Sequence, residues 1–472
     1  MEAEGVVVDV VEVLYCEGWD PEARAAVAPL AEAEARRRDG NGEPYAVLLS
    51  HQGRPKALFQ VDWRHAYLGL FLFDAHGRRT VAYEYRQLEP GRLHLNRFRQ
   101  WGHSNDTEPE FPKPGVRFEL TVRPDGRGRR TLDTGASLQM GTDVPAEHRT
   151  VAKAEFGAWT AYIDLRALGP GSLSVVVSEP SSADAPAPGD GDGDGAGAGA
   201  GALWSAPMPL RPEGLEELFT PGVRLACGED RTALIGEPAP AGLLHLPTGS
   251  LAARDPGVRI WGEDDLGFTV TVPPGDYPVL VSTMRWEQED WDGETPAAMV
   301  RILDEPTVGW ELALMEGQDG RLLGEGQFYG FGVDTGTACF MDASGRDALP
   351  ELYEGAEPAF EEGVHSCTVA DPASGTNLIA FPSGFGDGSY PVWIGRAASG
   401  AVTCFVADML VLHGAEPLPP TVRTPAPYSP PFQGLIDDRR EAPFTDPGAT
   451  SEFIAGLIGE LVRFRRERDA VR

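Results

Sequence analysis

Short apolar and β-branched segments, separated by turn-forming residues, dominate the first 180 residues of the chain. Segments of this kind, bounded by Gly, Pro, Asn and Asp, predict β-strands. The predicted strands are residues 45–50, 57–63, 67–73, 80–86, 93–101, 116–122, 159–165 and 173–177. Residues 6–15 fit either a buried strand or the start of a helix. One helix is predicted at residues 21–38, which are rich in Ala, Glu and Arg and end before Asp39-Gly40.

Residues 181–202 break this pattern with a run of Gly, Asp and Ala. Such a run cannot bury a core and predicts a flexible linker. Short strands follow at residues 243–246, 268–272, 277–282, 297–303, 328–333, 338–341, 377–381 and 402–412. Residues 417–447 are proline-rich, and residues 451–468 carry apolar side chains at helical spacing. We expect a terminal helix there, packed either on its own domain or on a second copy of the chain.

The pattern predicts a mainly β protein, in the sense of a β-rich α+β fold. We expect two antiparallel-sheet domains, sandwich-like or barrel-like, with a C-terminal helix. The predicted divisions are an unassigned domain at residues 1–180, a linker at 181–204, a second domain at 205–415, and a proline-rich tail with the helix at 416–472. The length of 472 residues also favours two domains, because a single core seldom grows so large.

Charge narrows the classes of partner. The chain has 72 acidic and 40 basic residues, which gives a formal net charge of −32. Nucleic acid is not expected as a partner, because phosphate binding needs a basic surface. An acidic surface favours solubility, and it would suit a basic protein partner or bound cations.

The five cysteines are scattered and form no CxxC pair, so neither a disulfide framework nor a zinc site is predicted. The acidic start lacks the features of a signal peptide. No segment reaches the roughly 20 apolar residues that a membrane helix requires. We therefore expect a cytoplasmic protein without a membrane partner; its oligomeric state stays open.

Two glycine-rich blocks, at residues 330–342 and 381–391, carry the candidate chemistry. The candidate catalytic or metal-binding carboxylates are Asp334, Asp342 and Asp387, and the candidate ligand-binding residues are Thr335, Thr337, Asn377, Ser383 and Tyr390. Several oxygens brought together by glycine turns could hold a divalent cation, although no cofactor is identified. The alternative is structural: the aspartates cap turns, and Phe381, Phe385, Tyr390 and Trp393 belong to a sandwich core.

The second half resembles a known family through motifs that occur in order along it. They are Leu246-Pro247-Thr248-Gly249, Asp255-Pro256, residues 274–279 (PGDYPV), residues 310–313 (WELA), residues 332–337 (GVDTGT) with Phe340-Met341-Asp342, and residues 383–391 (SGFGDGSYP). These resemble the bacterial family called domain of unknown function 4241, over roughly residues 243–413. The resemblance implies a shared module and no established activity. Residues 286–294, rich in Trp and acid, depart from the family pattern.

Three functions remain compatible with the sequence. The leading hypothesis is a binding or interaction module that recognises a basic protein, as toxin-neutralising immunity proteins do by analogy. The second is a metal-assisted hydrolase, which requires the three aspartates to converge within about 5–6 Å. The third is a small-molecule sensor with an apolar pocket inside the second sandwich. Whether the protein is an enzyme is left open.

Overall fold

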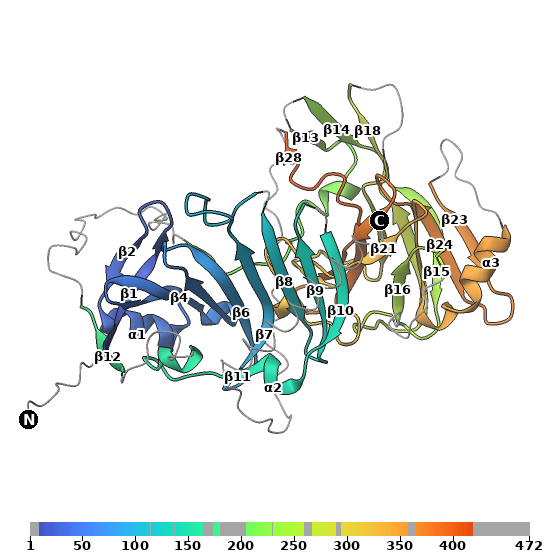
Figure 1. The fold of residues 1–472 in the computed structure, drawn as a ribbon. Coiled ribbons are helices and arrows are strands. Elements are labelled where there is room, and N and C mark those ends of the chain that lie inside the picture. Colours follow the sequence, from blue (N-terminus) through green and yellow to red (C-terminus); the bar gives the residue numbers. More distant parts are fainter. Residues whose placement is uncertain are drawn as a thin grey trace, which may run out of the picture. The chain divides into compact units, whose positions relative to one another are not determined.

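The computed structural model describes residues 9–113, 115–135, 137–163, 173–179, 204–228, 230–258, 267–288, 294–356 and 365–418. These residues belong to two compact units, with the division between Ala206 and Pro207 (Figure 1). Nearly all of the predicted linker and all of the predicted C-terminal helix lie outside the described residues.

A twelve-stranded sheet forms the first unit. Its strands are β1 (Asp9–Asp20), β2 (Ala25–Leu30), β3 (Tyr45–His51), β4 (Arg54–Asp62), β5 (Tyr67–Phe73), β6 (Arg79–Glu89), β7 (Arg92–Gly102), β8 (Val116–Val122), β9 (Arg127–Asp133), β10 (Ser137–Asp143), β11 (Thr150–Ala152) and β12 (Leu173–Val177). The helices are α1 (Glu32–Asn41), α2 (Ala146–Arg149), and the 3-10 turns η1 (Trp63–His65) and η2 (Trp159–Tyr162). Strands β3 to β10 pair in chain order, whereas β1 pairs with β3 and, in parallel, with β12 (Figure 1).

The predicted helix at 21–38 is wrong in its first half. Residues 25–30 form β2, which pairs with β1 from Asp20↔Ala25 to Tyr15↔Leu30, and α1 starts only at Glu32. Local composition favoured a helix, but pairing with a strand earlier in the chain decides the conformation. The predicted strand at 159–165 is also wrong over its described part, because Trp159–Tyr162 form a 3-10 turn.

Aromatic side chains fill the core of the first unit. Trp159 lies 5.5 Å from Phe59 and 6.1 Å from Tyr45, measured between ring centroids. Its indole N–H donates to the hydroxyl of Tyr15 at 3.2 Å. The 3-10 turn that carries Trp159 therefore closes the core from one face of the sheet.

Several smaller antiparallel sheets form the second unit. Their strands are β13 (Arg224–Cys227), β14 (Arg231–Ile235), β15 (Ala239–Leu246), β16 (Leu251–Arg254), β17 (Gly275–Val281), β18 (Met284–Trp286), β19 (Ala297–Arg301), β20 (Gly309–Leu312), β21 (Phe331–Val333), β22 (Thr337–Asp342), β23 (Cys367–Ala370), β24 (Asn377–Pro382), β25 (Gly388–Tyr390), β26 (Val392–Arg396), β27 (Val402–Asp408) and β28 (Glu416–Pro417). The helical segments are α3 (Ala348–Ala356) and the 3-10 turns η4 (Glu217–Phe219), η5 (Gly320–Leu322) and η6 (Ala343–Gly345). The predicted strand at 268–272 is not formed, although Phe268 and Val272 are buried.

Two of these sheets share a core and so form a sandwich. The six-stranded sheet runs β15-β17-β19-β27-β26-β20, and the four-stranded sheet runs β16-β22-β24-β23. Phe405 of the first packs in one apolar cluster with Phe340 and Phe381 of the second. Helix α3 covers the other face of the four-stranded sheet through Leu349 and Tyr353 (Figure 1).

The prediction of a mainly β fold with antiparallel sheets and few helices is confirmed. None of the sheets seen in the described residues closes into a barrel, so the sandwich alternative holds for the second unit. No helix within the described ranges combines the length and hydropathy needed to cross a bilayer.

Candidate functional site

The two glycine-rich blocks meet in the structure. Strands β21 and β25 pair through Phe331↔Tyr390, Gly332↔Ser389 and Val333↔Gly388. Beyond these strands the turns at residues 334–336 and 383–387 touch: the Ser383 N–H donates to the carbonyl of Gly336 at 3.1 Å. We call these two turns together the glycine corner.

A buried aspartate outside both blocks fixes the first turn. Asp255 is only 1% exposed, and its Oδ2 accepts hydrogen bonds from the N–H groups of Asp334 and Thr335, each at 2.8 Å. Its Oδ1 accepts from the Thr335 hydroxyl at 2.8 Å and from the Gly257 N–H at 2.7 Å. A carboxylate that accepts this many hydrogen bonds holds its partners in one arrangement. The sequence did not predict this role of Asp255, because Asp255-Pro256-Gly257 has the composition of an ordinary surface turn.

Asp342 has the same kind of role at another turn. It is fully buried, and it accepts from the Thr248 N–H at 3.0 Å and the Thr248 hydroxyl at 2.8 Å. It also accepts from the Ser344 N–H at 2.9 Å and the Ser344 hydroxyl at 2.6 Å. Asp342 therefore ties the Leu246–Gly249 motif to the end of β22 (Thr337–Asp342), as a structural cap does.

The second turn of the corner is fixed from within. The Tyr390 hydroxyl donates to the carbonyls of Ser383 and Gly386, at 3.0 and 2.7 Å. The Ser383 hydroxyl donates to Gly386 as well, at 3.0 Å. Gly384 has φ +54°, and a Cβ there would lie 2.9 Å from the Cβ of Met409, so only glycine fits. Burial and the nearby Asp387 carboxylate raise the pKa of Tyr390.

Phe385 does not join the core. Its side chain is 65% exposed, whereas Phe381, Tyr390 and Trp393 are buried as expected. The structural alternative for Phe385 is therefore wrong. The Gly384 and Gly386 conformations turn this residue outward, which its apolar character alone did not reveal.

The predicted carboxylate cluster is not assembled. Asp334 and Asp387 are exposed on the corner, whereas Asp342 is buried and bonded to Thr248 and Ser344. Over the described residues, which include all three aspartates, no group of three or more His, Cys, Asp or Glu side chains could hold a metal ion. The expected convergence of these three carboxylates, on which the metal-assisted hydrolase hypothesis depends, is therefore wrong.

The predicted ligand-binding residues mostly serve the fold. Thr335 bonds to Asp255, and Thr337 is buried at the start of β22. Asn377 donates to the Leu243 carbonyl and accepts from the His245 N–H, each at 2.8 Å, which links β24 to β15. Of the candidates, only residues on the surface of the corner remain able to meet a partner.

A cavity of about 180 Å³ lies apart from the corner in the same unit. It is lined from β14 by Ile235 and from β18 by Met284 and Arg285, and also by Glu294 and His365. A second cavity, beside Phe268, has about 10 Å³, room for no more than a single water. Neither is the apolar pocket inside the sandwich that the sensor hypothesis expected.

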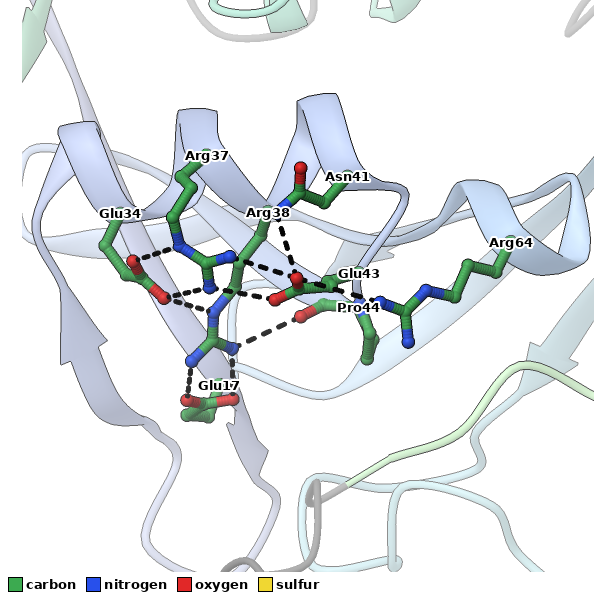
Figure 2. A network of polar contacts seen from close by, with 8 residues as sticks. All are labelled: Glu17, Glu34, Arg37, Arg38, Asn41, Glu43, Pro44 and Arg64. Atoms are coloured by element: carbon green, nitrogen blue, oxygen red, sulfur yellow. Dashed lines mark hydrogen bonds and ion pairs between the residues drawn. The ribbon is translucent and has the colours of Figure 1, made fainter.

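The first unit carries a dense polar network around α1 (Figure 2). Arg38 donates to both carboxylate oxygens of Glu17 on β1, at 2.8 and 2.9 Å. Glu34 accepts from Arg37 and Arg38, and these bonds lower the pKa of Glu34 to about 2. Because these charges pair with one another, the network fixes α1 and offers no reactive group.

The fold and these contacts define a two-unit, mainly β protein whose second unit is a sandwich with surface turns held by buried aspartates. Residues 244–407 of that second unit match the family model described as Protein of unknown function (DUF4241). The resemblance found in the sequence is thereby confirmed, and the match includes the whole glycine corner. No curated protein and no solved structure matches the chain.

Proposed function

We propose that the second unit is a protein-interaction module that binds a basic partner through the glycine corner, with Phe385 as the anchor. The observation that carries this proposal is the 65% exposure of Phe385 on a turn fixed by its own hydrogen bonds. Isolated exposed apolar side chains are common and need no explanation. A large aromatic side chain held outward by a rigid turn is different, because binding then costs little ordering of the anchor.

Burying such a side chain stabilises a complex. Full burial of a phenylalanine contributes on the order of 1.5–3 kcal/mol, and aromatic residues are enriched in protein interfaces. Because the hydrogen bonds of Tyr390 and Ser383 hold the turn in the free protein, most of that free energy is available for affinity.

Charge at the corner supports a basic partner. Asp334 and Asp387 are both exposed on the two turns of the corner, and Phe385 lies on the same turn as Asp387. A rim of carboxylates favours Lys or Arg opposite it, and the net charge of −32 speeds association with a basic protein. By analogy alone, this charge favours a basic toxin as the partner, bound in the way that an immunity protein binds its toxin.

Site-specific crosslinking tests the proposal. A photoreactive phenylalanine at position 385, introduced in producing cells, should capture a defined basic protein. The matched control is the same group at Leu243, which is 59% exposed in the same unit but outside the corner. Identical products from the two positions, or none from position 385, would refute the proposal.

Affinity measurements then give the contribution of Phe385 to binding. With the captured protein purified, Phe385→Ala should weaken binding roughly 10- to 100-fold, as hot-spot truncations do. Asp334→Asn with Asp387→Asn should act mainly on the association rate and lose its effect in high salt. Leu243→Ala should leave the dissociation constant unchanged.

A further inference from the structure

We propose that strand β12 of the first unit binds an extended segment of a partner protein, in which apolar and basic residues alternate, as an additional strand of the sheet. This surface belongs to the first unit, and the inference does not rest on the partner proposed for the glycine corner. Within the described residues, β12 (Leu173–Val177) is the last strand at its end of the sheet, next to β1 (Figure 1). Addition of a strand to such an edge is a recurring mode of peptide recognition.

The backbone of β12 directs hydrogen-bonding groups away from the sheet. Val177 lies opposite Val13 in the parallel ladder, and the Ser178 N–H donates to the Val13 carbonyl at 2.9 Å. Successive residues of a strand direct their N–H and C=O groups to opposite sides, so the groups of Val175 and Val177 point away from β1. No residue of the described ranges bonds to these outward groups. A row of such groups is a template for a further β-strand.

The side chains along this edge are apolar and open to solvent. Val175, Val176 and Val177 are 48%, 49% and 36% exposed, and Val10 on β1 is 39% exposed. Natural edge strands are commonly protected by Lys, Pro or an inward-pointing charge, and β12, with the sequence Leu-Ser-Val-Val-Val, has none of these. An open apolar edge without such protection indicates a surface that a partner covers.

The two faces of this edge differ in chemistry. Val175 lies in register with the core residue Val11, so its side chain is on the core face of the sheet. Val176 lies in register with Glu12, and both side chains are on the opposite face. Glu12 and Glu179, which follows the strand, are exposed. An added strand therefore needs apolar residues on the core face and favours Lys or Arg on the other.

Charge also favours a different protein over a second copy of the chain. Pairing of two β12 edges would bring together two chains that each have a net charge of −32, and each would bring its own Glu12 to the contact. Such like-charge repulsion opposes association, whereas a basic strand removes it.

Hydrogen exchange of the full chain tests the inference. The probe is a short peptide of alternating Val and Lys with blocked ends, titrated up to millimolar concentration. It should slow exchange of the amides in residues 173–179 in a saturable manner, because the outward N–H groups of Val175 and Val177 become bonded. The matching peptide of alternating Val and Glu should bind at least about 10-fold more weakly, a difference of about 1.4 kcal/mol.

Backbone methylation of the probe separates strand addition from simple attraction between charges. In an extended peptide, the N–H groups of all Val residues point to one side and those of all Lys residues to the other. N-methylation of one of these two sets should therefore abolish the protection, and N-methylation of the other set should leave it.

Two matched variants locate the site. Val175→Lys should weaken binding of the Val and Lys peptide at least about 10-fold, because it adds a like charge to the edge. Val116→Lys changes a valine of β8 that is also 48% exposed, and it should keep the affinity.

Several results would overturn the inference. They are no protection of residues 173–179 by the Val and Lys peptide, equal binding of the Val and Glu peptide, equal binding of the two methylated peptides, and binding that is unchanged in Val175→Lys. Protection that appears without peptide and grows with protein concentration would also overturn it, because the occupant would then be a second copy. The wild-type titration with the four peptides decides the question even if a variant fails to fold.

Discussion

Around α1, acidic side chains meet arginines on the surface, mostly three to six positions away along the chain. At the turns of the second unit, by contrast, Asp255 and Asp342 are buried and accept from backbone N–H groups 79 and 94 residues away. The same type of side chain therefore serves short-range surface pairing in one unit and long-range turn fixation in the other.

The two uses differ in energetic weight. An exposed ion pair contributes about 0.2–1 kcal/mol, because water screens it and solvates either partner when the other is removed. A buried donor left without its acceptor costs about 1–3 kcal/mol, because no water replaces the bond. Loss of a carboxylate should thus be mild at α1 and severe at the buried turns.

Asp342→Ala should have the largest effect. It would leave the Thr248 and Ser344 N–H groups without their acceptor, with a loss of about 3–5 kcal/mol in the free energy of unfolding of the second unit. Urea denaturation measures this loss, with Asp387→Ala, an exposed aspartate of the same unit, as the control. Equal losses from the two variants would remove the distinction between buried and exposed carboxylates.

Asp408 gives a pH-dependent test of burial. Burial raises the pKa of this carboxyl to about 6, above the unfolded value of about 3.9. The folded state therefore holds the proton more tightly, and stability falls as pH rises from about 4 to about 6. Above that window the buried charge costs on the order of 1–3 kcal/mol.

Asp408→Asn should remove this cost, because the amide oxygen can still accept from the Leu410 N–H. We expect the variant to exceed the wild type in stability at pH 7.5 and to equal it near pH 4, as measured by denaturation across the range. The measured quantity is the free energy of unfolding of the wild type minus that of the variant. If this difference is larger at pH 7.5 than at pH 4, the raised pKa is contradicted.

Arg38→Ala should have an intermediate effect in the first unit. Its guanidinium bonds Glu17, Glu34 and the Pro44 carbonyl, and its side chain is 20% exposed. The expected loss is about 1 kcal/mol, since the freed carboxylates remain partly accessible to water. Denaturation in low and high salt checks this: the difference between wild type and variant should shrink as salt screens the pairs.

Several elements of the fold follow from sequence alone because their partners are close in the chain. Strands β3 to β8 were predicted by apolar segments and turn residues, and each pairs with its neighbour in sequence. The misplaced start of α1 shows that a close partner is not always enough: β2 forms a local hairpin with β1, but its Ala-rich composition resembles that of a helix. In the second unit, Ala297 pairs with Asp408, more than one hundred residues away, and no local pattern encodes that order.

The candidate site shows the same limit. The glycine blocks could be picked out from the sequence as turns, because glycine and turn residues mark sharp bends. Their pairing through β21 and β25 is what the structure adds. The sequence could not show that Asp342 faces Thr248, that Asp255 fixes Thr335, or that Phe385 points outward. The first two depend on contacts between distant segments, as the cavity beside Arg285 does. The exposure of Phe385 instead belongs to a turn with local hydrogen bonds and two glycines of positive φ.

Glu34→Gln should have the smallest effect of these variants on the free energy of unfolding. It also allows the pH dependence of the two units to be compared. Hydrogen bonds from Arg37 and Arg38 lower the pKa of Glu34 to about 2, so its contribution is present above the unfolded pKa of about 4.3 and is lost as pH falls toward 2. The side chain is 37% exposed, so solvent screening keeps that contribution below about 0.5 kcal/mol. Between pH 6 and about 4, Glu34 should leave the first unit unchanged while protonation of Asp408 stabilises the second. Hydrogen exchange of amides in β1 and β27 across this pH range measures the stability of the two units separately. An equal change in stability in both units would show that the burial of the carboxylate does not determine the pH response.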